Sequence, residues 1–195
     1  MTEVLAMPQD VHSEPWTIDD VLAAPPKNGM RYELIEGRLV VSPVPPPPHQ
    51  AAGKRLIRIL DSAAPRELEA SPETNLRVGA DMFIPDVMVA KSEALFASGS
   101  MYVAPEDVLM VVEIISPGNS TFERAWKPQQ YAKGGIPFYM EIELPAGPRV
   151  LASELRDGKY ERVAEARAGE TLKLAEPFPV SFDPGDLVGP RRSAG

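Results

Sequence analysis

A continuous apolar segment, Val108–Ile115, stands out in the pattern of hydrophobic and polar positions along the chain. It is rich in β-branched residues and is followed by Ser116–Asn119, which predicts a strand that is buried on both faces. One charged residue, Glu113, interrupts it. An isolated carboxylate in such a strand costs several kcal/mol, against a total stability of roughly 5–15 kcal/mol. Glu113 must therefore be protonated, paired, bound to a metal or placed near an open strand end.

Shorter patterns before this segment predict a helix, a hairpin and a second helix. Thr17–Asp20 resembles a capping box at the start of a short helix. Arg31–Pro43 has the pattern of two strands that are joined by a tight turn at Glu36-Gly37. Pro45–Pro48 is a stiff spacer, and residues 49–64 after it have the apolar spacing of an amphipathic helix.

Two proline-containing segments are expected to form further strands. Leu68–Val78 is expected to be an edge strand, where its one proline is tolerated. Met82–Ala90 is expected to be an apolar strand that carries a single acid, Asp86. Pro85 should lie at the start of this strand or at a bulge, because proline cannot donate a hydrogen bond to a neighbouring strand. A helical turn is expected at Lys91–Phe96.

The remaining segments complete an α/β pattern. They predict a helix through about Lys133 that stops at Gly134-Gly135, a strand at Pro137–Leu144, a hairpin of Arg149–Leu155 and Lys159–Ala164, and a last strand near Thr171–Leu174. The order of strands and helices predicts one mixed central β-sheet that is flanked by helices, with an N-terminal hairpin and a C-terminal β-hairpin. We expect a single domain at residues 16–188, a flexible N-terminal arm at 1–15 and a loose tail at 189–195.

Composition narrows the class of protein. The net charge of −8 argues against a broad basic face that binds nucleic acid, but it leaves room for a local basic groove. The negative net charge also fits a site whose carboxylates bind a divalent cation. The chain has no cysteine, no apolar run near the ~20 residues of a membrane span and no visible secretory signal. These features predict a cytoplasmic protein outside the membrane.

Candidate chemistry comes from two acids and one helix. If the strands with Asp86 and Glu113 are neighbours, their carboxylates converge and offer the oxygen ligands of a hard divalent cation. Lys127, Gln130 and Tyr131 are spaced to share one face of the following helix. An acid pair that faces a lysine suits phosphodiester hydrolysis, in which a metal acidifies water and the ammonium stabilises negative charge.

A purely structural interpretation uses the same residues. Asp86 could be an acid at a strand start, and Glu113 could form a structural ion pair with Lys127. Lys127 could also pair with Glu123 along the helix. Its own position has two alternatives, because Pro128 disfavours helix at the residue before it. Either the helix starts late, at Pro128, or it starts near a capping box at Ser120 and Glu123 and kinks.

Three blocks of sequence resemble a known family. They are YELIEGRLVVSP (32–43), PDVMVA (85–90) and VVEIISPGNSTFERAWKPQQYAKGGIPFYMEIE (111–143). In order and spacing they resemble the Uma-two family of restriction-endonuclease-like proteins, in the PD-(D/E)XK nuclease superfamily. The resemblance covers most of Tyr32–Leu144 and implies a restriction-endonuclease-like α/β core.

The resemblance implies roles for the two acids and the lysine. The superfamily's magnesium ligands map onto Asp86 and Glu113, with Glu33 and the Ile114 carbonyl as further candidates. Ile115 stands where the superfamily lysine would be, and Lys127 on the next helix is expected to replace it.

Further residues match the family pattern and remain open between two interpretations. Glu33 matches a family acid, or it is a solvated strand residue. His49 stands where the family often has a histidine, or it is structural. Gln130 could orient a metal-bound water or contact phosphate, or it is a surface glutamine. Tyr131 continues the family pattern.

The expected function is a Mg²⁺- or Mn²⁺-dependent endonuclease that acts on DNA phosphodiesters, and the superfamily's habits favour a homodimer. One alternative is a catalytically inert nuclease-like module for binding or assembly, which the acidic charge and the displaced lysine favour. Another is a structural network of ion pairs around Glu113.

Overall fold

A computed structural model of the chain describes residues 14–25, 29–115, 121–144 and 147–189, without the side chains of 121–123. Most of the expected arm and tail, the loop after the apolar strand, and the expected capping residues Ser120 and Glu123 lie outside this description. The helices are α1 (Ile18–Ala23), α2 (Pro47–Ala63), α3 (Ser92–Leu95) and α4 (Thr121–Lys133), with short 3-10 turns at Pro105–Asp107 and Pro184–Leu187. The strands are β1 (Met30–Ile35), β2 (Arg38–Pro43), β3 (Leu68–Pro72), β4 (Leu76–Val78), β5 (Asp81–Phe83), β6 (Val87–Lys91), β7 (Val108–Ile115), β8 (Phe138–Glu143), β9 (Arg149–Arg156), β10 (Lys159–Arg167), β11 (Leu172–Leu174) and β12 (Val180–Phe182).

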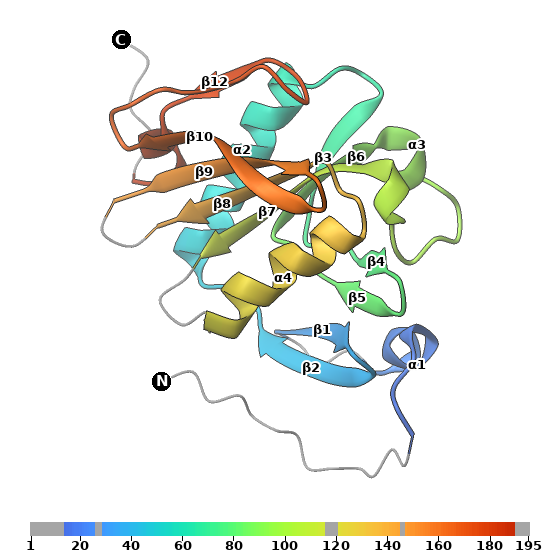
Figure 1. The fold of residues 1–195 in the computed structure, drawn as a ribbon. Coiled ribbons are helices and arrows are strands. Elements are labelled where there is room, and N and C mark those ends of the chain that lie inside the picture. Colours follow the sequence, from blue (N-terminus) through green and yellow to red (C-terminus); the bar gives the residue numbers. More distant parts are fainter. Residues whose placement is uncertain (1–13, 26–28, 116–120, 145–146, 190–195) are drawn as a thin grey trace.

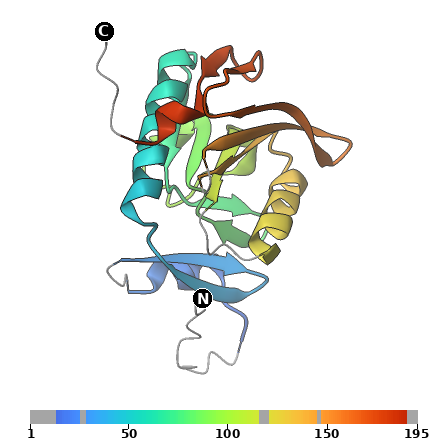
Figure 2. The same ribbon diagram turned by 90° about the vertical axis from the view of Figure 1, so that its left-hand side faces the viewer.

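A mixed sheet forms the centre of the molecule. Its six strands have the order β10-β9-β8-β7-β6-β3, and β7 and β8 are parallel whereas the other neighbours are antiparallel. Helices α2 and α4 cover opposite faces of this sheet (Figures 1 and 2). The expected fold class, a mixed sheet flanked by helices, is therefore confirmed.

Strand β7 is buried on both faces, as its apolar pattern predicts. Met110, Val112 and Ile114 belong to the core on the α2 side, whereas Val111 belongs to the core that contains Tyr131 of α4. Because side chains alternate along a strand, Glu113 follows Val111 to the α4 side. The strand alternation thus directs the one acid of β7 toward helix α4.

The two proline-containing segments do not form single strands, and this corrects the sequence prediction. The segment at 68–78 divides into β3 and β4, and the segment at 82–90 divides into β5 and β6, with Pro85 at the break. In each segment the two strands belong to different sheets. Strands β3 and β6 pair in the central sheet, whereas β4 and β5 join β1 and β2 in a separate sheet. Proline lacks a backbone N–H and has a fixed φ, so the chain leaves one sheet there and enters another.

The small sheet with order β2-β1-β5-β4 lies beside the central one, so the expectation of one sheet is wrong. Its hairpin turn has φ of 50° at Glu36 and 73° at Gly37, the left-handed values of a tight two-residue hairpin turn. The expected capping box of Thr17 and Asp20 starts α1, which packs on this sheet.

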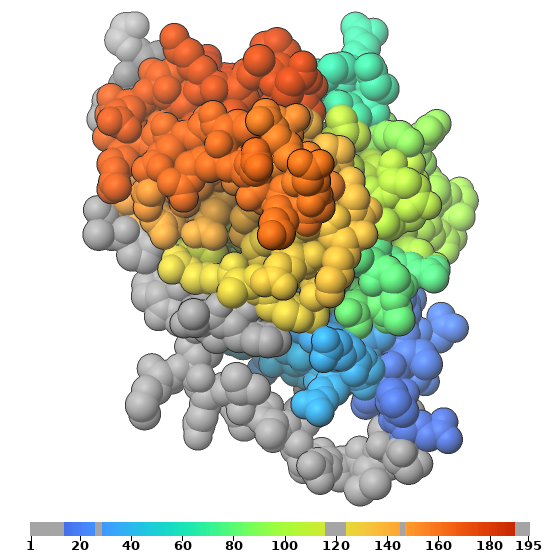
Figure 3. All heavy atoms as spheres, viewed as in Figure 1, coloured from blue at the N-terminus to red at the C-terminus, as the bar shows by residue number. Residues whose placement is uncertain are grey.

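Helix α4 begins at Thr121 and includes Pro128, so it does not start late and Lys127 lies inside it. The β9–β10 hairpin lies directly above α4 on one face of the molecule (Figure 3).

On the other side, β12 packs near α2 and forms a two-stranded sheet with β11; the sequence pattern did not predict β12. No helix in the described ranges is long and apolar enough to cross a membrane.

Candidate active site

The predicted site residues come together from separate elements at the junction of the two sheets. They are Glu33 from β1, His49 from α2, Asp86 from the segment before β6, Glu113 from β7, and Lys127, Gln130 and Tyr131 from α4. Each of these residues is at most 8% exposed. Burial of so many polar groups requires partners, and most of these groups are partners of one another.

Three donors surround the carboxylate of Asp86. Its Oδ2 accepts a hydrogen bond from the backbone N–H of Ile114 at 2.8 Å and lies 3.1 Å from Nε2 of His49. Its Oδ1 accepts a hydrogen bond from Nη1 of Arg31 at 3.0 Å. Burial favours the neutral acid, but His49, Arg31 and the Ile114 amide outweigh burial and lower the pKa of Asp86. Asp86 is therefore an anion in the folded protein.

His49 bridges Asp86 and the backbone of β7. Its Nε2 lies 2.8 Å from the carbonyl oxygen of Ile114 as well as near Asp86. Both neighbours can only accept hydrogen bonds, so Nε2 carries the proton and donates. Burial lowers the pKa of His49, but the hydrogen bonds and the charge of Asp86 outweigh it, and the net shift is upward.

Glu113 faces α4, as the strand alternation requires. Its Oε1 accepts a hydrogen bond from the hydroxyl of Tyr131 at 2.5 Å and lies 3.5 Å from Nζ of Lys127. Burial is the largest influence and raises the pKa of Glu113 to about 7, although Lys127 counteracts it. Glu113 is therefore a carboxyl group that titrates near neutral pH.

Lys127 also binds Glu33. Its Nζ donates to Oε1 of Glu33 at 2.9 Å, and the same oxygen accepts the backbone N–H of Ile84 at 2.9 Å. Burial opposes the ammonium charge, but Glu113 and Glu33 outweigh it and raise the pKa of Lys127. Glu33 is 4% exposed, so the interpretation of it as a solvated strand residue is wrong.

Gln130 is buried rather than a surface residue, which corrects that alternative. Among the described residues, its side chain accepts a hydrogen bond from Nζ of Lys133 at 3.3 Å. Gln130 thus lies in the same buried layer of α4 as Lys127 and Tyr131, but its hydrogen bond connects it to the end of the helix.

Arg31 is a member of the site that the sequence reasoning missed. Its Nη1 contacts Asp86 and also lies 3.7 Å from Oε1 of Glu73, and its buried Nε has no hydrogen-bond partner among the described residues. One signal could have found it. Arg31 is two residues before Glu33 on a strand, so the two side chains emerge on the same face.

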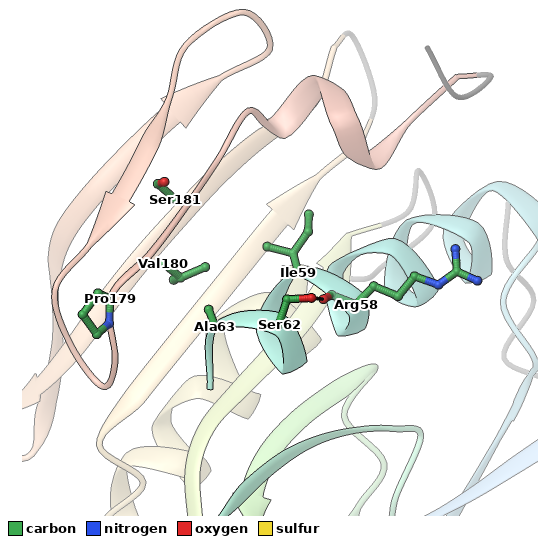
Figure 4. A pocket seen from close by; sticks show the side chains of 7 residues that line it. All are labelled: Arg58, Ile59, Ser62, Ala63, Pro179, Val180 and Ser181. Carbon is green, nitrogen blue, oxygen red and sulfur yellow. Dashed lines mark hydrogen bonds between the residues drawn. The ribbon is translucent and has the colours of Figure 1, made fainter. Parts of the chain in front are cut away.

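A cavity of about 370 Å³ opens beside Asp86 and is lined by His49, Gln50, Gly53, Lys54, Ile57, Pro72, Glu73, Asp86 and Ile114. It gives access to the site from the α2 side. A second hollow of about 590 Å³ lies between α2 and β12, and its lining has no acidic side chain (Figure 4). The smaller cavity is therefore the one that is lined by candidate catalytic side chains.

The donor atoms fit a divalent cation that is held by few protein ligands. Among the described residues, no three His, Asp or Glu side chains are gathered closely enough to hold an ion by themselves. Asp86, Glu113 and the Ile114 carbonyl offer hard oxygen atoms, and Mg²⁺ commonly takes one or two carboxylates and completes its shell with water and substrate phosphate. The N–H of His49 occupies Asp86 Oδ2 and the Ile114 oxygen, so an ion at those atoms would displace it.

Comparison with known proteins agrees with this geometry. Residues 18–187 match the model of the Uma2 family, whose description is "Putative restriction endonuclease". The chain belongs to the Uma2 family. This result confirms the family resemblance that the sequence blocks indicated.

A solved structure has the same fold as this Uma2 chain. A crystal structure from Anabaena variabilis, titled as that of a "putative nuclease belonging to DUF820", superposes with a TM-score of 0.65 and 20% identity, over 89% of this chain and 97% of that chain. At this identity the likeness concerns the fold. No curated protein matches the chain.

Proposed function

We propose that this Uma2 protein is a divalent-metal-dependent endonuclease that hydrolyses DNA phosphodiester bonds. Asp86, Glu113 and the Ile114 carbonyl would hold Mg²⁺ or Mn²⁺, and Lys127 would be the electrostatic partner. The observation that carries the proposal is that the ammonium of Lys127 lies 3.5 Å from Oε1 of Glu113. A cytoplasmic location and a homodimer remain predictions.

The raised pKa of Lys127 supports an electrostatic role for its side chain. A lysine that stays protonated at neutral pH cannot act as a general base, so its contribution is positive charge beside the attacking water and the phosphate. A bound divalent ion would acidify a water molecule and neutralise phosphate charge. In the reaction the water oxygen loses a proton and bonds to phosphorus, one P–O ester bond breaks, and the leaving oxygen takes up a proton.

Glu33, Tyr131 and His49 support this arrangement. Glu33 binds the ammonium of Lys127 in addition to Glu113, and the Ile84 amide fixes Glu33 in turn. Tyr131 orients Glu113, and His49 orients Asp86. We therefore assign these three residues to positioning; Glu33 would bind a metal ion through its second oxygen, Oε2, because its Oε1 is bound to Lys127.

The test is cleavage of a supercoiled plasmid in Mg²⁺ or Mn²⁺. Asp86→Ala and Glu113→Ala should abolish metal-dependent cleavage, and Lys127→Ala should lower turnover more than metal affinity. The matched control is Glu67→Ala, which removes an exposed carboxylate away from these contacts. Circular dichroism would check that each variant is folded. Unchanged cleavage by purified Glu113→Ala would end the hypothesis.

A second candidate function is a nuclease-like module without activity. The observation that favours it is that the internal cations Arg31, His49 and Lys127 already neutralise the buried acids. Calorimetric titration of the wild-type protein with Mg²⁺ and Mn²⁺ separates the two functions. Binding that disappears in Asp86→Ala supports the nuclease, and no binding supports the inert module.

A further inference from the structure

Helix α2 carries three cations that have no carboxylate partner in the part of the chain that the structure describes. Lys54, Arg55 and Arg58 lie on it, and among the described residues none of them is within ion-pair distance of a carboxylate. Elsewhere, arginines such as Arg149 and Arg162 contact acids at 2.7 and 2.9 Å. The whole chain has 28 acidic and 20 basic residues, so unpaired cations gathered on one helix run against its overall charge.

Arg55 has a structural role, whereas the other two cations face outward. Arg55 donates to the backbone oxygens of Asp186 and Gly189 and so attaches the C-terminal segment to α2. Lys54 and Arg58 are exposed. They are four residues apart, which places them on one face of the helix about 6 Å apart along its axis.

This exposed row begins at the candidate active site. Gln50 is one turn before Lys54, and both residues line the cavity that contains Asp86. Arg58 is one turn after Lys54 and lines the hollow beside β12. Figure 4 shows its guanidinium extended along α2, away from Ala63 and toward the earlier turns of the helix. The row Gln50–Lys54–Arg58 is therefore a continuous polar path that leads out of the site.

The chemistry of the row indicates what it binds. Lysine and arginine side chains are common partners of backbone phosphates, and a contact to phosphate carries no base sequence. The one aromatic ring on α2, that of His49, is buried, so the helix offers no exposed ring on which a base could stack. The cavity wall contains two acids, Glu73 and Asp86, and the described ion pairs connect them to Arg31 and His49 and not to Lys54 or Arg58. A polyanion with regularly spaced phosphates, which starts at the site and continues over α2, matches this pattern of charge.

We propose that Lys54 and Arg58, with Gln50, form a track on α2 that binds the sugar–phosphate backbone of the nucleic-acid strand in the site. The proposal rests on the nuclease function and extends it to the path of the substrate. It assigns the binding to phosphates, which DNA and RNA share, and so predicts weak dependence on base sequence.

The test is binding of fluorescent DNA oligonucleotides to the full chain, measured by anisotropy in EDTA so that no cleavage is needed. The variant is Lys54→Gln with Arg58→Gln. The matched control, Lys159→Gln with Lys173→Gln, removes the same charge from exposed cations on β10 and β11. Loss of two phosphate contacts should weaken binding and reduce the slope of log K against log salt by about 1.8 for duplex DNA, or about 1.4 for a single strand. The control should retain the wild-type slope.

Several outcomes would overturn the track. They are a wild-type protein that binds no oligonucleotide in low salt, equal slopes for the variant and the control, or a loss of binding that is confined to DNA and absent with RNA of the same sequence. The last result would place the contact on the sugar instead of phosphate. Because binding is measured without metal, a wild type that binds in EDTA but does not cleave the plasmid in Mg²⁺ or Mn²⁺ refutes the nuclease alone. A protein that cleaves, but whose variant has an unchanged salt slope, refutes the track alone.

Discussion

Replacement of Glu113 by glutamine should stabilise the metal-free protein at alkaline pH. The pKa of Glu113 rises from 4.5 to about 7 on folding, chiefly because of burial. The folded state therefore holds a proton that the unfolded state has lost between these values, and stability falls as pH rises through this window. Glutamine keeps the shape of the protonated acid and can still accept the hydrogen bond from Tyr131, but it has no charge to bury.

The magnitude follows from the pKa. One pKa unit corresponds to about 1.4 kcal/mol, so ionised Glu113 costs about 3 kcal/mol at pH well above 7. The advantage of Glu113→Gln over wild type should grow by about 2–3 kcal/mol between about pH 5 and about pH 8. This is a large part of the stability of a small domain.

The assay is urea unfolding in EDTA at several pH values, with Glu67→Gln as the exposed control. The control should follow the wild-type curve at each pH. A constant difference between Glu113→Gln and wild type across this range would refute the burial argument, because a Glu113 whose pKa is the same in the folded and unfolded protein gives no pH dependence. A decreasing difference would mean that Lys127 outweighs burial and that the pKa is lowered.

Two further perturbations test the cations of the site. Lys127→Ala leaves the buried Glu33 and Glu113 without their ammonium and should lower the free energy of unfolding in urea by about 3–5 kcal/mol at neutral pH. The control Lys133→Ala, at an exposed lysine, should lower it by less than about 1 kcal/mol. Equal losses of stability in the two variants would contradict the ion-pair geometry. Arg31→Met removes a cation that helps to lower the pKa of Asp86, so the folded-state pKa moves towards its ordinary value and less stability should be lost on acidification below that value than in wild type. Superimposable acid-unfolding curves would show that Arg31 does not act on Asp86.

The fold was largely predictable from local patterns, and the predictions that were wrong have a common cause. The apolar run of β7, the hairpin at Glu36-Gly37 and the capping box at Thr17 depend on short-range geometry, which the sequence displays directly. The segments around Pro72 and Pro85 were predicted as single strands because each pattern is continuous. A pattern of alternation does not show which sheet a strand joins, and each of these segments passes from one sheet to the other.

In the candidate site, too, the sequence identifies single residues but not the partners that they contact. Glu113 could be singled out from sequence because an acid inside a buried strand needs a partner wherever the strand lies. Its partners could not be chosen from sequence, since Lys127 had local alternatives such as Glu123, and Glu33 is 94 residues away from the lysine that it binds.

By itself, the amino-acid sequence determined that a buried strand carries a carboxyl group and that a helix with a lysine and a tyrosine follows it. Only the tertiary structure decided that Arg31 and His49 hold Asp86, and that Lys127 lies between two acids. The physical reason is that hydrophobic periodicity reports how a residue faces its own element, whereas ion pairs depend on how distant elements pack against one another.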